Sequence, residues 1–249
     1  MDPERTESEI NDQSSKRWLI AVAAPREVNS VLCAFEKHVL VIPNRWARCE
    51  LNDRFDLVFT GVGKANAAGA VAKVLDPDRH TGVLSVGIAG SLPHSKSNDG
   101  VECEIGDVIC ASESIFADEG VETPDEFISC SEMGFSIFDD GTDRRVHSQE
   151  SITWLKPFSD YVGSIACVSI CSGTNERATQ VSTTTGALAE AMEGAAVSLA
   201  AWRVNPSIHS AELRVVSNTT GNRSQQKWDL ESALKKLEDV LGRLNKHYK

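Results

Sequence analysis

The stretch WLIAVAAPREVNSVLCAF, residues 18–35, decides the fold class. Its first seven residues form a short, continuous apolar run, which predicts a strand. The residues that follow place Val28, Val31 and Leu32 at the spacing of one helical face, which predicts a helix. A strand that leads directly into a helix is the repeating unit of α/β proteins.

The same alternation continues along the chain. Apolar runs predict further strands at 55–61, 81–90, 104–114, 163–173, 187–192 and 212–218, and helical patterns lie at 62–75, 193–204 and 224–244. Strands that alternate with helices imply right-handed βαβ units and a sheet with helices on both faces. We therefore expect a three-layer α/β/α single domain with a central mixed, twisted sheet.

Three segments lack this pattern. Residues 1–15 carry five acidic side chains, one arginine and a single aliphatic residue, so we expect a flexible acidic tail there and one folded domain at 16–249. Residues 94–106 and 118–145 are polar and rich in Asp, Ser and Gly. We expect both to be long loops, which in compact domains are usually functional or mobile.

Composition excludes several classes of function. The net charge of −11 repels phosphate backbones and anionic headgroups, and no apolar run approaches the roughly 20 residues that span a bilayer, so we expect neither nucleic acid nor a membrane as a partner. Seven scattered cysteines without CxxC spacing indicate reduced thiols and a cytoplasmic protein. The six histidines lack metal-ligand spacing, so we interpret each as a surface or loop residue and expect no metal and no cofactor.

Polar side chains follow several of the predicted strands, where ligands bind in open α/β sheets. Glu27 and Glu193 both lie at strand-to-helix junctions. A carboxylate at such a junction stabilises the helix N-terminus and can also face a ligand. The residues by themselves leave both interpretations open.

Four short segments together resemble one known superfamily. They are VGIAGSL (86–92), SGTNERA (172–178), AEAMEGAAVSLA (189–200) and RVVSN (214–218). This combination resembles the purine nucleoside phosphorylase and hydrolase superfamily, which includes the methylthioadenosine nucleosidases, and is most similar to the futalosine hydrolases. The resemblance extends from about Trp18 to the last predicted helix and implies a nucleoside phosphorylase-like catalytic domain at 16–249.

The resemblance implies roles for individual residues. Met192 and Glu193 would bind ribose, because a thioether fits an apolar sugar face and a carboxylate accepts two hydroxyl hydrogens. Asn218 takes the position that holds the departing base, where adenosine-type members have aspartate. Glu27 would be the general base that activates water. Further substrate contacts are implied at Ala89, Gly90, Ser172 and Gly173.

One segment departs from the pattern of the futalosine hydrolases. SNTTGNR, residues 217–223, is similar to their SNxxGDR, but Asn222 stands in place of the aspartate. The replacement removes a carboxylate that could pair with Arg223, and it leaves the interpretation of Asn218 unchanged.

The function implied by the resemblance is hydrolysis of the N-glycosidic bond of futalosine, which releases hypoxanthine and dehypoxanthine futalosine in menaquinone biosynthesis. A nucleoside is then the small-molecule partner, and the enzyme is a homo-oligomer in which a neighbouring subunit helps to close the site. Three alternatives stay open: a purine nucleoside phosphorylase, an adenine-releasing nucleosidase acting on aminodeoxyfutalosine or methylthioadenosine, and a nucleoside-binding protein without activity.

The end of the first strand bears on the choice between water and phosphate. Hexameric-type phosphorylases have GDPxR where this chain has AAPRE, residues 23–27, so Glu27 replaces a phosphate-binding arginine. A second such arginine corresponds to Ser85. We therefore expect water as the nucleophile, and the adjacent Arg26 is the residue that keeps phosphorolysis open.

Overall fold

The computed structural model describes residues 17–37, 41–93 and 102–247. The strands of its main sheet are β1 (Arg17–Val22), β2 (Arg48–Glu50), β3 (Phe55–Phe59), β4 (His80–Ser91), β5 (Val108–Phe116), β8 (Arg144–Val146), β9 (Tyr161–Cys167), β10 (Ala189–Ala191) and β11 (His209–Thr219). Their order is β10-β9-β5-β11-β4-β1-β3-β2, and β8 pairs with β5. Parallel and antiparallel pairs both occur, so the prediction of a mixed sheet is confirmed.

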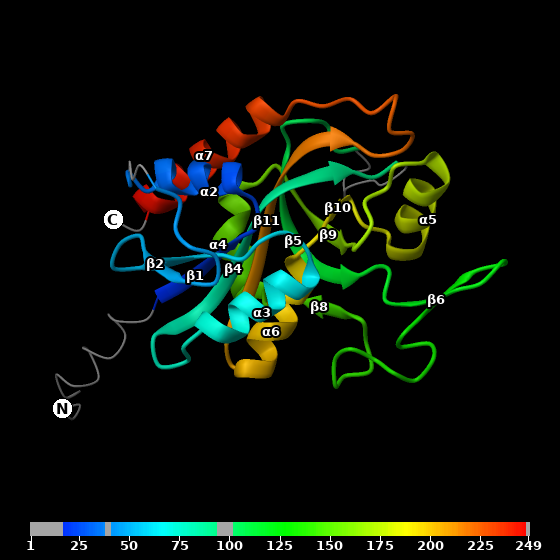
Figure 1. The fold of residues 1–249 in the computed structure, drawn as a ribbon, viewed down its shortest axis with the longest axis horizontal. Coiled ribbons are helices and arrows are strands. Elements are labelled where there is room, and N and C mark those ends of the chain that lie inside the picture. Colours follow the sequence, from blue (N-terminus) through cyan, green and yellow to red (C-terminus); the bar gives the residue numbers. More distant parts are fainter. Residues whose placement is uncertain (1–16, 38–40, 94–101, 248–249) are drawn as a thin grey trace, which may run out of the picture.

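Helices cover both faces of this sheet (Figure 1). They are α2 (Pro25–Ala34), α3 (Lys64–Val74), α4 (Gln149–Leu155), α5 (Asn175–Thr185), α6 (Gly194–Val204) and α7 (Leu230–His247), with a short 3-10 helix η1 (Lys156–Phe158) after α4. The helices α2 and α7 pack together on one face, and α3 and α6 pack together on the other. The predicted three-layer α/β/α architecture is confirmed.

The first strand shows why the sheet has two cores. Ile20 and Val22 pack in the apolar cluster with residues of α2 and α7, whereas Leu19 and Ala21 pack in the cluster with residues of α3 and α6. Successive strand side chains point to opposite faces, so a continuous apolar run serves both cores. All four side chains are buried.

The sheet partly closes on itself next to the cavity described below. Strand β10 pairs in parallel with β9 and antiparallel with the end of β4, where Glu190 faces Gly90. The ends of β4, β10 and β11 are therefore drawn together. The sequence patterns predicted a sheet with helices on both faces and gave no sign of this closure.

The prediction of a long loop at 118–145 is wrong in part. This segment contains the antiparallel hairpin of β6 (Gly120–Glu122) and β7 (Phe127–Ser129), which extends away from the body of the molecule, and most of β8 (Figure 1). Three-residue strands that are exposed or half-buried carry no apolar alternation, so periodicity does not detect them.

The tail at 1–15 and residues 94–101 of the other predicted loop lie outside the described residues. Across the described ranges, no helix has the length and apolar character needed to cross a membrane.

Candidate active site

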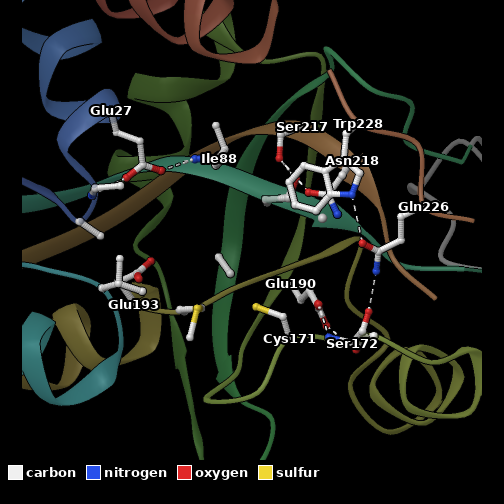
Figure 2. A pocket seen from close by; sticks show the side chains of 18 of the residues that line it. Glu27, Ile88, Cys171, Ser172, Glu190, Glu193, Ser217, Asn218, Gln226 and Trp228 are labelled. Atoms are coloured by element: carbon white, nitrogen blue, oxygen red, sulfur yellow. Dashed lines mark hydrogen bonds between the residues drawn. The ribbon is translucent and has the colours of Figure 1, made fainter. Parts of the chain in front are cut away.

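A cavity of about 450 Å³ opens beside the ends of β1, β4, β10 and β11. Figure 2 shows Glu27 and Glu193 on one side of it, and Asn218 and Gln226 on the other. All eight residues that the sequence indicated for the site line this cavity: Glu27, Ala89, Gly90, Ser172, Gly173, Met192, Glu193 and Asn218. The structure thus brings them together, and their individual roles remain predictions.

Glu27 caps a helix and lines the cavity at the same time. It is the third residue of α2, and its Oε2 accepts the backbone N–H of Ala24 at 2.8 Å. Its Oε1 accepts the N–H of Ile88 on β4 at 2.9 Å. Burial raises the pKa of this carboxyl above its ordinary value of 4.5, although Arg214 and the two N–H donors act in the opposite direction. Both interpretations of Glu27 are therefore compatible with its geometry.

Glu193 is fixed at the start of α6 between two donors. Its Oε1 accepts the N–H of Gly63 at 3.0 Å, and its Oε2 lies 3.4 Å from Nη1 of Arg214. The Gly63 backbone has φ of +93°, a conformation that glycine adopts without strain. The turn before α3 thus presents an N–H to the Glu193 carboxylate.

Arg214 is a fully buried cation behind the two carboxylates. Its side chain is 1% exposed and donates to Glu212 at 2.8 Å and to the Ser85 hydroxyl at 2.9 Å. Although burial disfavours the charge, the neighbouring carboxylates raise the pKa of Arg214 further above its ordinary range. A Cβ atom at Gly87 would lie 2.5 Å from Glu27 Oε1 and 2.7 Å from Arg214 Nη1, so these two groups fill the space that the glycine leaves.

Asn218 follows an irregularity in β11. The pairing with β4 shifts between Val216 and Asn218, so that Ser217 is an extra residue. Such a bulge redirects the side chains next to it. The Asn218 Oδ1 accepts the Ser217 hydroxyl at 2.8 Å, and Nδ2 donates to the Thr219 carbonyl at 2.9 Å. One N–H and one carbonyl lone pair of the amide remain for a ligand.

A third buried carboxylate of the cavity lining holds the loop that carries Ser172. Glu190 Oε1 accepts the Ser172 N–H at 2.7 Å, and Oε2 accepts its hydroxyl at 2.6 Å. Burial raises the pKa of Glu190, and the two bonds from Ser172 oppose that rise. Because Ser172 gives both donors to Glu190, it can offer a ligand only its acceptors.

A chain of hydrogen bonds joins this loop to the segment after β11 (Figure 2). Gln226 donates to the Ser172 carbonyl at 2.9 Å and accepts the indole N–H of Trp228 at 3.1 Å. Arg223 also donates to Gln226 and lies over the Trp228 ring, 4.7 Å from its centroid. No carboxylate pairs with Arg223 within the described ranges, in agreement with the asparagine at position 222.

Several lining or supporting residues were not predicted from the sequence. They are Glu190, Arg214, Arg223, Gln226 and Trp228. For Arg214 a signal was available, because Glu212 and Arg214 are opposite charges two residues apart in an apolar strand. That spacing puts both on one face of a buried sheet, where charges need partners.

Arg26, the residue that kept phosphorolysis as an alternative reaction, does not line the cavity. The Arg26 side chain is 51% exposed and pairs with Glu231 at the start of α7. Ser85, at the position of the second phosphate-binding arginine, is buried and bonded to Arg214.

The interpretation of every histidine as a surface or loop residue is wrong for His80, which begins β4, is 1% exposed and is hydrogen-bonded inside the fold. His147 lies in the loop between β8 and α4, although that loop residue is also buried and hydrogen-bonded. Among the described residues, no three His, Cys, Asp or Glu side chains are grouped so that they could hold a metal ion.

A family model and a curated relative show the family of this chain, and solved structures show that its fold is shared. The model of the Phosphorylase superfamily matches residues 46–247. The futalosine hydrolase of Acidothermus cellulolyticus is 34% identical over 237 residues, which cover 93% of this chain and 91% of that protein. Among solved structures, a futalosine hydrolase mutant of Helicobacter pylori superimposes with a TM-score of 0.72 at 18% identity, over 93% of this chain and 99% of that one. A methylthioadenosine/S-adenosylhomocysteine nucleosidase of the same organism gives 0.70 at 17% identity, over 94% and 100%.

Proposed function

The chain belongs to the phosphorylase superfamily, and we propose that it is an N-glycosidase that hydrolyses futalosine. The products would be hypoxanthine and dehypoxanthine futalosine, as a cytoplasmic step of menaquinone biosynthesis. The observation that carries the proposal is the pairing of two buried carboxylates, Glu27 and Glu193, with the amide of Asn218 around one cavity. The 34% identity to a futalosine hydrolase supports the choice of substrate.

In the proposed reaction, the bond between the ribose C1′ and the purine N9 breaks, and its electron pair goes to the purine. A water oxygen bonds to C1′, and Glu27 takes the proton that this water loses. The purine takes up one proton from solvent at N7 and leaves as neutral hypoxanthine, and Glu27 later returns its proton to solvent. The raised pKa of Glu27 brings the carboxylate closer to the pKa that suits a general base near neutral pH. The backbone donors Ala24 and Ile88 hold the carboxylate in place.

Glu193 is proposed to accept the 2′ and 3′ hydroxyls of the ribose. Its position at the helix start, fixed by Gly63 and Arg214, leaves acceptor capacity for both. Met192 lines the same part of the cavity and packs against the apolar cluster of Leu92 and Val168. Its thioether would contact the sugar.

Asn218 is proposed to hold the departing base. Its free N–H can donate to O6 of a 6-oxopurine. Its carbonyl can accept from N7–H while the electron pair of the broken bond moves to the purine. An adenine-releasing nucleosidase is the second candidate, because such an enzyme has the same fold with a TM-score of 0.70. The amide at position 218 favours the oxopurine.

Water is proposed as the nucleophile. Glu27 and Ser85 occupy the two positions where phosphorylases place arginines, and the Arg26 side chain pairs with Glu231 outside the cavity. The carboxylate at position 27 would also repel phosphate.

The test is product release from futalosine, aminodeoxyfutalosine, inosine and methylthioadenosine, each with and without phosphate. We expect the largest kcat/KM for futalosine, free hypoxanthine as product and no effect of phosphate. A strong increase in the rate of base release with phosphate, together with formation of a sugar 1-phosphate, would identify a phosphorylase instead. Binding without turnover of any of the four would identify a nucleoside-binding protein.

We also propose a homo-oligomer. Val62 and Trp228 line the cavity and are 49% and 46% exposed, so a neighbouring subunit could cover them. Light scattering coupled to size exclusion tests this, and a monomer at micromolar concentration would contradict it.

A further inference from the structure

A row of buried polar side chains continues from the cavity into the interior of the sheet. It begins at Glu193 and passes through Arg214, Glu212 and Ser114 to His147. None of these residues is more than 7% exposed. Polar groups buried to this extent need partners, so each contact in the row bears on the position of the next.

Glu212 is the centre of the row. Arg214 and Glu212 are two residues apart on β11 and therefore lie on the same face of the sheet. The Arg214 Nε donates to Glu212 Oε1 at 2.8 Å, and Glu212 Oε2 accepts the hydroxyl of Ser114 on β5. Both oxygens of the carboxylate are thus held, one of them by the cation that lies behind Glu27 and Glu193.

The far end of the row is also fixed. His147 Nε2 lies 2.9 Å from Ser114 Oγ. On the other side of the ring, Nδ1 lies 3.0 Å from the carbonyl oxygen and 3.2 Å from the hydroxyl of Ser210. Burial lowers the pKa of His147 to about 4, so the ring is neutral at physiological pH.

Glu212 also packs against the backbone that carries Glu193. A Cβ atom at Gly194 would lie 2.0 to 2.2 Å from the Glu212 carboxylate. Every residue type other than glycine would collide there. The glycine after Glu193 therefore makes room for Glu212, and the two glutamates are linked through both Arg214 and the start of α6.

We infer that Glu212 is a positioning residue of the active site, which fixes the Arg214 guanidinium beside Glu193 and Glu27. Ser114 and His147 hold Glu212 in turn. The role rests on the proposed hydrolysis, because Glu212 acts through the two carboxylates that would contact water and ribose. It does not itself line the cavity.

The charges around Glu212 determine how a neutral residue at position 212 would affect Arg214. Besides Arg214, the described titratable groups around Glu212 include Glu193, His147 on the far side of Ser114, and the thiols of Cys110 on β5 and Cys167 on β9. Burial, together with the charge of Glu212, raises the pKa of each thiol to about 12, so both stay neutral. Without the Glu212 charge, Arg214 is less neutralised.

Glu27 responds to that change. The titratable groups that face it are Arg214 from β11 and Glu193 from the start of α6. A less neutralised Arg214 stabilises the Glu27 anion more strongly and lowers the pKa of Glu27. In a plot of kcat against pH, the rising limb is the range in which kcat increases as Glu27 loses its proton. This limb then moves to lower pH.

The test compares Glu212→Gln, which keeps the shape and removes the charge, with Glu212→Asp, which keeps the charge. Misplacement of a catalytic group by about 1 Å can cost 10²-fold, so we expect Glu212→Gln to lower kcat by roughly 10- to 100-fold. We also expect its rising limb at lower pH and a wild-type limb for Glu212→Asp. The matched control is Asp56→Asn, which neutralises another fully buried carboxylate bonded to an arginine and a histidine, and which should leave the limb unchanged.

A Glu212→Gln variant with the wild-type limb and kcat per folded molecule would overturn the inference. If that variant does not fold, Ser114→Ala removes the hydroxyl that holds Glu212 and should lower kcat several-fold. Its control, Ser198→Ala, removes a buried hydroxyl that has no hydrogen-bond partner among the described residues. Equal kcat values for these two variants would also overturn the inference. A wild-type protein that cleaves no nucleoside refutes the proposed function and this role with it, whereas a wild-type rate with unchanged variants refutes the inference alone.

Discussion

Gly90 leaves the space that the Asn218 side chain occupies: a Cβ atom at position 90 would lie 3.0 Å from Asn218 Nδ2. The same Cβ would lie 2.9 Å from Cγ2 of Thr220. The Asn218 amide and the segment after β11 therefore both pack closely against this glycine. Gly90, at the end of β4, thus makes room for the residue that is proposed to hold the base.

Gly90→Ala should displace the Asn218 amide. Since a misplacement of about 1 Å can cost 10²-fold, we expect a fall of that order in kcat/KM and weaker inhibition by hypoxanthine. Gly242→Ala is the control, because a Cβ at position 242 would meet only the Ala34 carbonyl oxygen, at 3.9 Å, and Gly242 does not line the cavity. Equal effects of the two substitutions would contradict the steric explanation.

Glu27→Gln should lower kcat by about 10²–10⁴-fold, the usual contribution of a general base. The amide keeps an acceptor for one of the two backbone donors, so nucleoside binding should change little. In the wild type, activity requires ionised Glu27 and is lost as pH falls through its raised pKa, above 4.5. Steady-state rates between pH 4 and 8 should show this limb in the wild type and not in the variant. Near-wild-type turnover would return Glu27 to a helix-capping role.

Glu193→Ala should reduce the preference for ribonucleosides over 2′-deoxyribonucleosides. A hydrogen bond to a charged group contributes about 1.5–3 kcal/mol, and the variant loses both sugar contacts. The ratio of kcat/KM for inosine and 2′-deoxyinosine measures the preference. An unchanged ratio would place the sugar hydroxyls away from Glu193.

Strand and helix patterns predicted the parts of the fold that contain long apolar runs. Continuous runs such as that of β1 supply side chains to both faces of the sheet. Glu27 and Glu193, which the pattern placed at strand-to-helix junctions, line one cavity together with the six residues that the resemblance implied. The helices α4 and α5 and the strand β2 were not predicted. Both helices are rich in Ser, Thr and other polar residues, so tertiary packing rather than apolar periodicity decides their structure.

The supporting residues of the site were missed for a different reason. Glu190, Glu212 and Arg214 are charged side chains inside strands, and their partners Ser172 and Ser114 are distant in sequence. Periodicity marks where apolar side chains face a core, and it does not identify which buried charges meet. The parallel pairing of β10 with β9 brings Glu190 beside the loop after β9 that carries Ser172.

Asp56→Asn should destabilise the protein, because Asp56 is fully buried among Arg17, Arg79 and His80. Burial opposes its charge, but the hydrogen bonds and charges of these partners lower its pKa. Its contribution to stability is therefore present above the ordinary value of 3.8 and is lost as pH falls below it. We expect a loss of about 3–5 kcal/mol in the free energy of unfolding at pH 7, measured with urea. The control is Asp53→Asn, at an exposed carboxylate 4.0 Å from Arg17.

Asn218→Asp should shift the preference from 6-oxopurines towards 6-aminopurines. The amide of Asn218 can donate to O6 and accept from N7–H, whereas an ionised aspartate accepts at both places and faces the lone pairs of O6. An unsatisfied buried acceptor costs about 1–3 kcal/mol, which should appear in kcat/KM for futalosine. An adenine amino group would instead donate to the new carboxylate.

The control for this shift is Asn222→Asp, which restores the aspartate usual in the similar SNxxGDR pattern. Its side-chain oxygen accepts the N–H of Asn175 at 3.1 Å, a bond that a carboxylate can also accept, so base preference should not change. The measurement is the ratio of kcat/KM for futalosine and aminodeoxyfutalosine in the wild type and both variants. If the wild type cleaves the two substrates equally well, the amide of Asn218 does not select the oxopurine, and the base must be recognised by other groups such as the backbone of the Ser172 loop.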